Sequence, residues 1–87
     1  MTDLASGIAE AGQCALLFRL GREVEGALRM VALFEQLLPT VQAQAPALLP
    51  PLTEQLSDIF SRQQAQDWLG LADSLQYELA ELLRQGA

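Results

Sequence analysis

Four stretches of the chain repeat apolar residues at helical spacing, and no stretch shows the sustained alternation of polar and apolar residues that is typical of a strand. Glycines and prolines separate these stretches. The pattern predicts an all-α fold, a small antiparallel bundle of three to four helices that forms one domain over residues 1–87. The predicted helices span about residues 3–20, 22–38, 51–62 and 67–85.

The first predicted helix has signals at both ends. Thr2 or Asp3 can cap its free amide groups, and Gly21 suits the left-handed residue that closes a helix. Asp67 is the corresponding cap for the last helix. Small residues four positions apart lie on the core face of the first helix, so another helix can approach it closely. That face consists of Leu4, Gly7, Ile8, Ala11, Ala15 and Phe18.

A proline-rich connector is expected at residues 39–51. Pro39 has no amide hydrogen and its ring would crowd the carbonyl of Glu35, so the second helix should end or kink there. Pro50 and Pro51 suit the opening turn of the third helix. The connector lies in the longest charge-free stretch of the chain, but its prolines and glutamines argue against a membrane span.

The composition removes most catalytic chemistry. The chain has no His, Lys or Asn, and its only cysteine is Cys14. General bases, amine nucleophiles and soft metal ligands are therefore almost absent. Cys14 borders the apolar face of the first helix and is interpreted as a small buried hydrophobe. We expect a protein that is not an enzyme and that uses no metal and no cofactor.

Charge and size limit the partners. Eleven acidic residues against five arginines give a net charge of −6, which repels nucleic acid and anionic membranes. The opening Met-Thr-Asp-Leu carries neither a basic segment nor an apolar run, so the expected location is the cytoplasm. A chain of this size buries only about 60–65% of its unfolded surface, so assembly, as in a homodimer, would help it.

The second predicted helix is apolar over an arc of about 220°, which one neighbouring helix cannot cover. It is either the centre of the bundle or part of an interface, and Met30, Leu33 and Leu37 are candidate partner-binding residues. Glu25 and Arg29 lie four apart, as in an exposed ion pair. The apolar set is Val24, Ala27, Leu28, Met30, Val31, Leu33, Phe34, Leu37 and Leu38.

Tyr77 lies in the polar arc of the last helix, in line with Gly70 and Asp73. One interpretation is a contact patch in which tyrosine offers a rigid face and Gly70 lets a partner approach the backbone. The other is a tyrosine that lies along its own helix or under the proline-rich connector, with its hydroxyl in water. Gly70, Asp73, Tyr77 and Glu78 are the further candidate partner-binding residues. Trp68 is expected to be a core anchor rather than part of a pocket.

Two runs, Gln66–Leu79 (QDWLGLADSLQYEL) and Leu20–Gly26 (LGREVEG), resemble a pattern in small acidic helical proteins of bacteria. In size and acidity the chain is similar to the export chaperones of flagellar and type III secretion systems. The resemblance covers about half of the chain. It implies that a helical groove binds an amphipathic segment of an export substrate, with Asp73, Tyr77 and Glu78 facing that partner.

Two functions therefore stay open. In the first, the protein is an interaction module that receives an amphipathic helix from another protein. In the second, it is a self-associating structural homo-oligomer whose two-fold interface buries the excess apolar surface of the second helix. Exposure of that helix in the isolated chain is the feature that bears on the choice.

Overall fold

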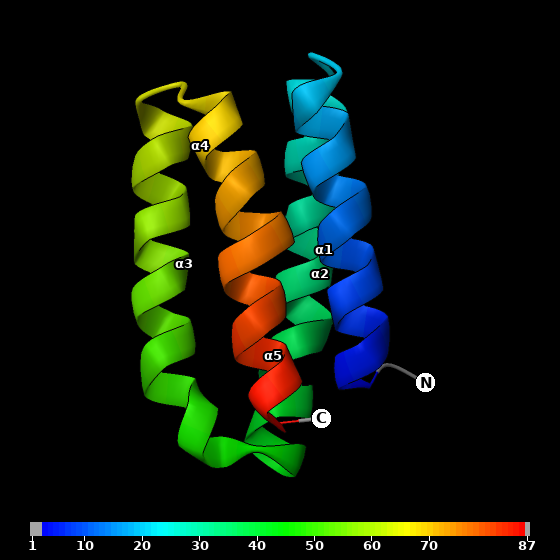
Figure 1. Cartoon of the computed structure of the whole chain (residues 1–87), viewed down its shortest axis with the longest axis vertical. Coiled ribbons are helices and arrows are strands. Elements are labelled where there is room, and N and C mark those ends of the chain that lie inside the picture. The colour runs from blue at the N-terminus through cyan, green and yellow to red at the C-terminus, as the bar shows by residue number, and fades with distance from the viewer. Residues whose placement is uncertain (1–2, 87) are drawn as a thin grey trace.

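The computed structural model describes residues 3–86, and it confirms the all-α fold. Four helical rods form an up-down-up-down bundle, and the described residues contain no strand (Figure 1). None of these helices is long and apolar enough to cross a membrane. In chain order the elements are α1 (Leu4–Arg19), α2 (Glu23–Gln44), the 3₁₀ turn η1 (Pro46–Leu48), α3 (Leu49–Gln64), and a C-terminal rod made of α4 (Trp68–Asp73), the π-helical η2 (Ser74–Leu79) and α5 (Ala80–Gly86).

Polar caps begin the first and last rods, and one glycine follows the end of the first. Asp3 and Asp67 each accept a hydrogen bond from the backbone amide three residues on, at 2.7 and 3.1 Å. After α1, Gly21 adopts a φ of 77°, a conformation that strains any residue with a side chain. The predicted caps at Asp3 and Asp67 are confirmed, whereas the alternative cap, Thr2, lies outside the described residues.

The structure corrects the prediction that residues 39–51 form a connector, and of the two outcomes expected at Pro39, an end or a kink, it rules out the end. α2 continues through Pro39 for more than a turn, and only Ala45 and η1 separate it from α3. Leu37 and Val41, two residues before and after the proline, are fully buried. Their packing in the core holds the helix together where the proline lacks its backbone hydrogen bond. Pro39 and Glu35 both lie on the exposed side, where water can reach the carbonyl that lacks its amide partner.

Small residues of α1 let the rods approach closely at the centre of the bundle. Gly7 is buried, and a Cβ atom added to it would lie 2.9 Å from Leu37 Cδ1 and 3.5 Å from Leu83 Cδ1. α1 therefore packs against both α2 and the C-terminal rod. The largest fully buried side chains are Met30, Leu37, Val41, Leu52, Ile59, Leu71, Leu75, Leu79 and Leu83.

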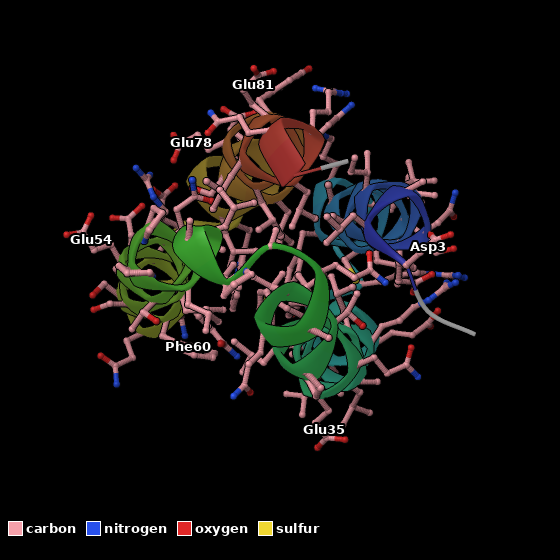
Figure 2. The ribbon with its side chains drawn as sticks, turned by 90° about the horizontal axis from the view of Figure 1, so that it is seen from below. Asp3, Glu35, Glu54, Phe60, Glu78 and Glu81 are labelled. Atoms are coloured by element: carbon pink, nitrogen blue, oxygen red, sulfur yellow. The ribbon has the colours of Figure 1, made fainter. Side chains whose placement is uncertain are left out.

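The edge between α2 and α3 is the loosest in the bundle. Seen along the bundle, α3 packs against the C-terminal rod and makes only sparse contact with α2 (Figure 2). One edge-to-face ring contact, between Phe34 and Phe60, joins the two helices with centroids 6.3 Å apart. Phe60 remains partly exposed at this edge. The bundle is thus least closed along one side of α2.

Candidate functional site: an apolar row on α2

α2 carries apolar side chains on two sides, and those on the outer side face solvent. Val24, Leu28, Val31 and Leu38 are 73%, 71%, 49% and 36% exposed. Their spacings of four, three and seven residues place them in one stripe along the helix. We call these four residues the α2 row. A stripe of large apolar side chains left in water is the kind of surface that binds another protein.

A groove of about 310 Å³ lies beside the N-terminal half of the α2 row. One wall consists of α2 side chains and the opposite wall of Trp68, at the start of α4. Its lining residues are Glu23, Val24, Ala27, Leu28, Val31, Gln63 and Trp68. The groove is therefore mainly apolar, with one carboxylate at its edge.

Trp68 owes its position to α1. Its ring stacks on the ring of Phe18 with centroids 5.7 Å apart and an angle of 11° between the planes. Trp68 is only half-buried, so it is anchored in the core on one face and lines the groove on the other. The expectation of a core anchor is met, but the tryptophan is part of a pocket as well.

The three α2 residues predicted to bind a partner lie in the core instead. Met30, Leu33 and Leu37 are at most 4% exposed, so no partner can reach them in the folded chain. The broad apolar arc of this helix is divided between an inner face, which holds them, and the outer row. Sequence reasoning missed the outer row, although Glu35 lies within the same stripe between Val31 and Leu38 and marks it as facing solvent.

Two residues of the predicted patch on the last helix are used within the chain. A Cβ atom on Gly70 would collide with the side chains of Asp67 and Arg62, so these groups cover the backbone that a partner was expected to approach. Asp73 accepts a hydrogen bond from Arg19 at 2.7 Å, and this ion pair ties the C-terminal rod to α1. The structure thus overturns the interpretation of Gly70 as an open approach site.

The other two residues of that patch do face solvent. Tyr77 is 60% exposed, and the carboxylate of Glu78 points away from the bundle (Figure 2). The backbone carbonyl of Glu78 accepts a hydrogen bond from Gln55 of α3 at 3.4 Å. Tyr77 is therefore an exposed aromatic residue that does not line the groove beside the α2 row.

The π-helical segment η2 explains how the last rod keeps its core face. Leu71, Leu75, Leu79 and Leu83 are four residues apart, and all four are fully buried. In a regular α-helix each step of four overshoots a turn by about 40°, so this set would drift around the rod. The wider π turn offsets that drift. It also buries Ser74, whose hydroxyl has no hydrogen-bond partner within residues 3–86.

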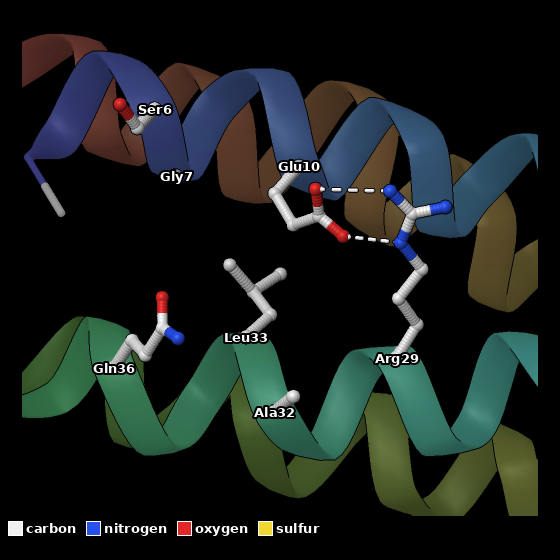
Figure 3. Close-up of a pocket in the computed structure, with 7 residues that line it drawn as sticks. All are labelled: Ser6, Gly7, Glu10, Arg29, Ala32, Leu33 and Gln36. Carbon is white, nitrogen blue, oxygen red and sulfur yellow. Dashed lines mark hydrogen bonds and ion pairs between the residues drawn. The ribbon is translucent and has the colours of Figure 1, made fainter.

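A second groove of about 310 Å³ lies between α1 and α2, but an internal ion pair spans it (Figure 3). Arg29 Nε donates to Glu10 Oε1 at 2.6 Å, and this hydrogen bond raises the pKa of Arg29. The predicted pair between Glu25 and Arg29 is replaced by this contact, and Glu25 lies 3.9 Å from Arg22 instead. Each charged group lining this groove is already satisfied, so the groove beside the α2 row is the stronger candidate site.

The thiol of Cys14, the only cysteine of the chain, is inaccessible to solvent. Cys14 is fully buried, and burial together with the nearby Glu10 carboxylate raises the pKa of its thiol to about 11. Within residues 3–86 no three metal-ligating side chains lie close enough together to hold an ion. What the described surface offers is apolar contact area with acidic groups around it.

Comparison of the chain with known protein families, with curated proteins and with solved structures gives no match.

Proposed function

We propose that the protein is a non-enzymatic interaction module that binds an amphipathic helix of a partner protein along the α2 row. The observation that carries the proposal is the exposed stripe of Val24, Leu28 and Val31 beside a groove walled by Trp68. An amphipathic helix presents apolar residues at the same three- and four-residue spacings, so its apolar face can lie along this stripe. Covering apolar surface stabilises a complex by about 25 cal/mol per Å² before the costs of association.

The shape of the bundle supports this choice of surface. α2 is fixed by its contacts with α1, while its side toward α3 stays loosely packed. A helix added at that edge would lie beside α2, Trp68 and the exposed ring of Phe60. The binding surface is therefore largely preformed, which lowers the entropic cost of binding.

Self-association is the second candidate function, and the geometry of the row favours it in one respect. Positions 24, 28, 31, 35 and 38 follow the alternating spacing of a coiled-coil seam. Two antiparallel copies of α2 could pair about a two-fold axis near Val31 and cover both rows. The protein would then be a structural homodimer with no separate partner.

Dye binding and mass measurement test the proposal and separate it from its alternative. We expect the purified chain to be a monomer by sedimentation equilibrium and to enhance the fluorescence of anilinonaphthalene sulfonate in its native state. Leu28→Gln should reduce this enhancement, whereas Leu16→Gln, at an exposed leucine of α1 outside the row, should not. A dimer that binds no dye, and that Leu28→Gln dissociates, would favour the self-associating protein.

The resemblance to export chaperones implies a cellular role for the proposed interaction. Such a chaperone would act in the cytoplasm and hold the amphipathic segment of an export substrate. The residues that would face the substrate are those of the α2 row, since Gly70 and Asp73 are used within the bundle.

A further inference from the structure

All five arginines of the chain are used in internal ion pairs. The pairs, with their closest N to O distances, are Arg19 with Asp73 (2.7 Å), Arg22 with Glu25 (3.9 Å), Arg29 with Glu10 (2.6 Å), Arg62 with Asp58 and Asp67 (3.1 Å each), and Arg84 with Glu81 (3.5 Å). The chain contains no lysine or histidine. Every arginine therefore already has an acidic partner within the bundle.

Four glutamates, in contrast, have no ion pair or side-chain hydrogen bond within the described residues: Glu23, Glu35, Glu54 and Glu78. Two of them belong to the surface of the α2 row, one beside it and one within its stripe. Glu23 lines the groove beside Val24, and Glu35 lies in the stripe between Val31 and Leu38 and points to solvent (Figure 2). Glu35 is twelve positions after Glu23, which is about 18 Å along a helix and about 120° around its axis.

A second copy of the chain fits this charge pattern poorly. In an antiparallel pairing centred on Val31, Glu35 would face Leu28 of the copy. The Glu35 carboxylate would then lose its contact with water and would have no cation as a partner. Two molecules that each carry a charge of −6 also repel one another. The electrostatics of the row therefore favour a different partner over self-association.

We propose that the α2 row binds a basic amphipathic helix. Its apolar stripe covers Val24, Leu28 and Val31, and a Lys or Arg near each end pairs with Glu23 and Glu35. Two such cations lie eleven or twelve positions apart, about three turns, so that they reach both carboxylates at once. This inference rests on the proposed function and specifies its partner, which carries charge opposite to that of the protein.

A peptide-display selection tests the inference. The library consists of helical peptides with a fixed Leu stripe at three- and four-residue spacing and with Lys, Gln or Glu varied at every other position. The full-length protein is the bait, and peptides that also bind the Leu28→Gln variant are discarded. We expect the enriched peptides to carry Lys at positions eleven or twelve apart, and to bind about 3- to 10-fold more tightly than their Gln counterparts, an advantage that falls with added salt.

Two double variants with the same change in net charge provide the matched control. Glu23→Gln with Glu35→Gln should abolish the preference for Lys, whereas Glu54→Gln with Glu78→Gln should leave it intact. All four side chains are unpaired among residues 3–86, so neither double variant breaks an ion pair or a side-chain hydrogen bond of that region. Folding of each variant is checked by circular dichroism.

The outcomes separate the two proposals. Enrichment that depends on Leu28 but shows no preference for Lys would overturn the basic partner and leave the helix-binding function standing. The basic partner is also overturned if the preference for Lys is lost in the Glu54 and Glu78 double variant and kept in the other. The Lys residues of the peptide would then contact the surface near Tyr77 or α3. If no enriched peptide depends on Leu28 for binding, both proposals are overturned.

Discussion

Phe18 and Trp68 stack nearly parallel, with their ring centroids 5.7 Å apart, and so join the end of α1 to the start of α4. α2 also packs against this pair at Gly26, where an added Cβ atom would lie 3.2 Å from the ring of Phe18. The wall of the candidate groove is therefore held by residues from three helices. Since Trp68 is the only tryptophan, its fluorescence reports on this place alone.

Removal of the Trp68 ring should destabilise the whole bundle. Trp68→Ala deletes the stack and exposes Phe18, and we expect it to lower the free energy of unfolding by about 2–3 kcal/mol, somewhat less than for a fully buried aromatic residue. Trp68→Phe keeps a ring against Phe18 and should cost less than half as much. Urea unfolding followed by circular dichroism measures both. Equal losses would show that the stack itself contributes little.

The fold was largely predictable because its signals are local. Helical periodicity, the caps at Asp3 and Asp67 and the closing glycine, Gly21, depend on residues within one turn of each other. Pro39 misled the prediction because proline carries a local penalty, whereas the burial of Leu37 and Val41 that outweighs it comes from other helices. The π segment was missed for a similar reason, since only the packing of the last rod requires it.

The candidate site was harder to predict than the fold. The sequence shows that α2 is apolar over a wide arc, but not which part of the arc faces the core. Met30 and Leu28 are both apolar, and only the packing of the other rods buries the first and leaves the second exposed. The groove at Trp68 also needs Phe18 from α1, and no spacing within one helix could reveal that contact.

Two adjacent leucines of α2 test its two faces directly. Leu37 is fully buried and Leu38 is 36% exposed, so the same substitution should have very different effects. We expect Leu37→Ala to lower the free energy of unfolding by about 2–5 kcal/mol and Leu38→Ala by less than about 1 kcal/mol. Chemical denaturation gives both values. Similar losses would contradict the orientation of α2 in the bundle.

Two glycines of α1 should respond to alanine with opposite signs. A Cβ atom at Gly7 would lie 2.9 Å from Leu37 Cδ1 in the core, whereas nothing lies within 4 Å of one at Gly12. Gly12→Ala should therefore stabilise the protein by up to about 1 kcal/mol through helix propensity. Gly7→Ala gains the same propensity but crowds the core, and we expect a net loss on the order of 1 kcal/mol. A stabilised Gly7→Ala would show that α1 and α2 are less tightly packed.

Burial of Cys14 should make the protein less stable at alkaline pH. The pKa of the thiol is raised from 9.0 to about 11, so the unfolded chain loses this proton first as the pH rises. The folded state then holds more protons than the unfolded state, and stability falls between these two values by an amount on the order of 2 kcal/mol. Cys14→Ala should lack this part of the decline. Parallel pH profiles for the two proteins would contradict it.

Pro39 allows the continuity of α2 to be tested by a gain of stability. In the structure the helix passes through Pro39, so Pro39→Ala would restore an amide that can bond the carbonyl of Glu35 and would remove the crowding by the ring. The unfolded chain gains freedom as well, which offsets about 0.4–1 kcal/mol. Because an interior proline costs about 3 kcal/mol, we expect a net stabilisation of at least 1 kcal/mol, or about 4–8 °C in Tm. If the helix instead ended at Pro39, the substitution would leave Tm unchanged or lower it, since only the unfolded chain would benefit.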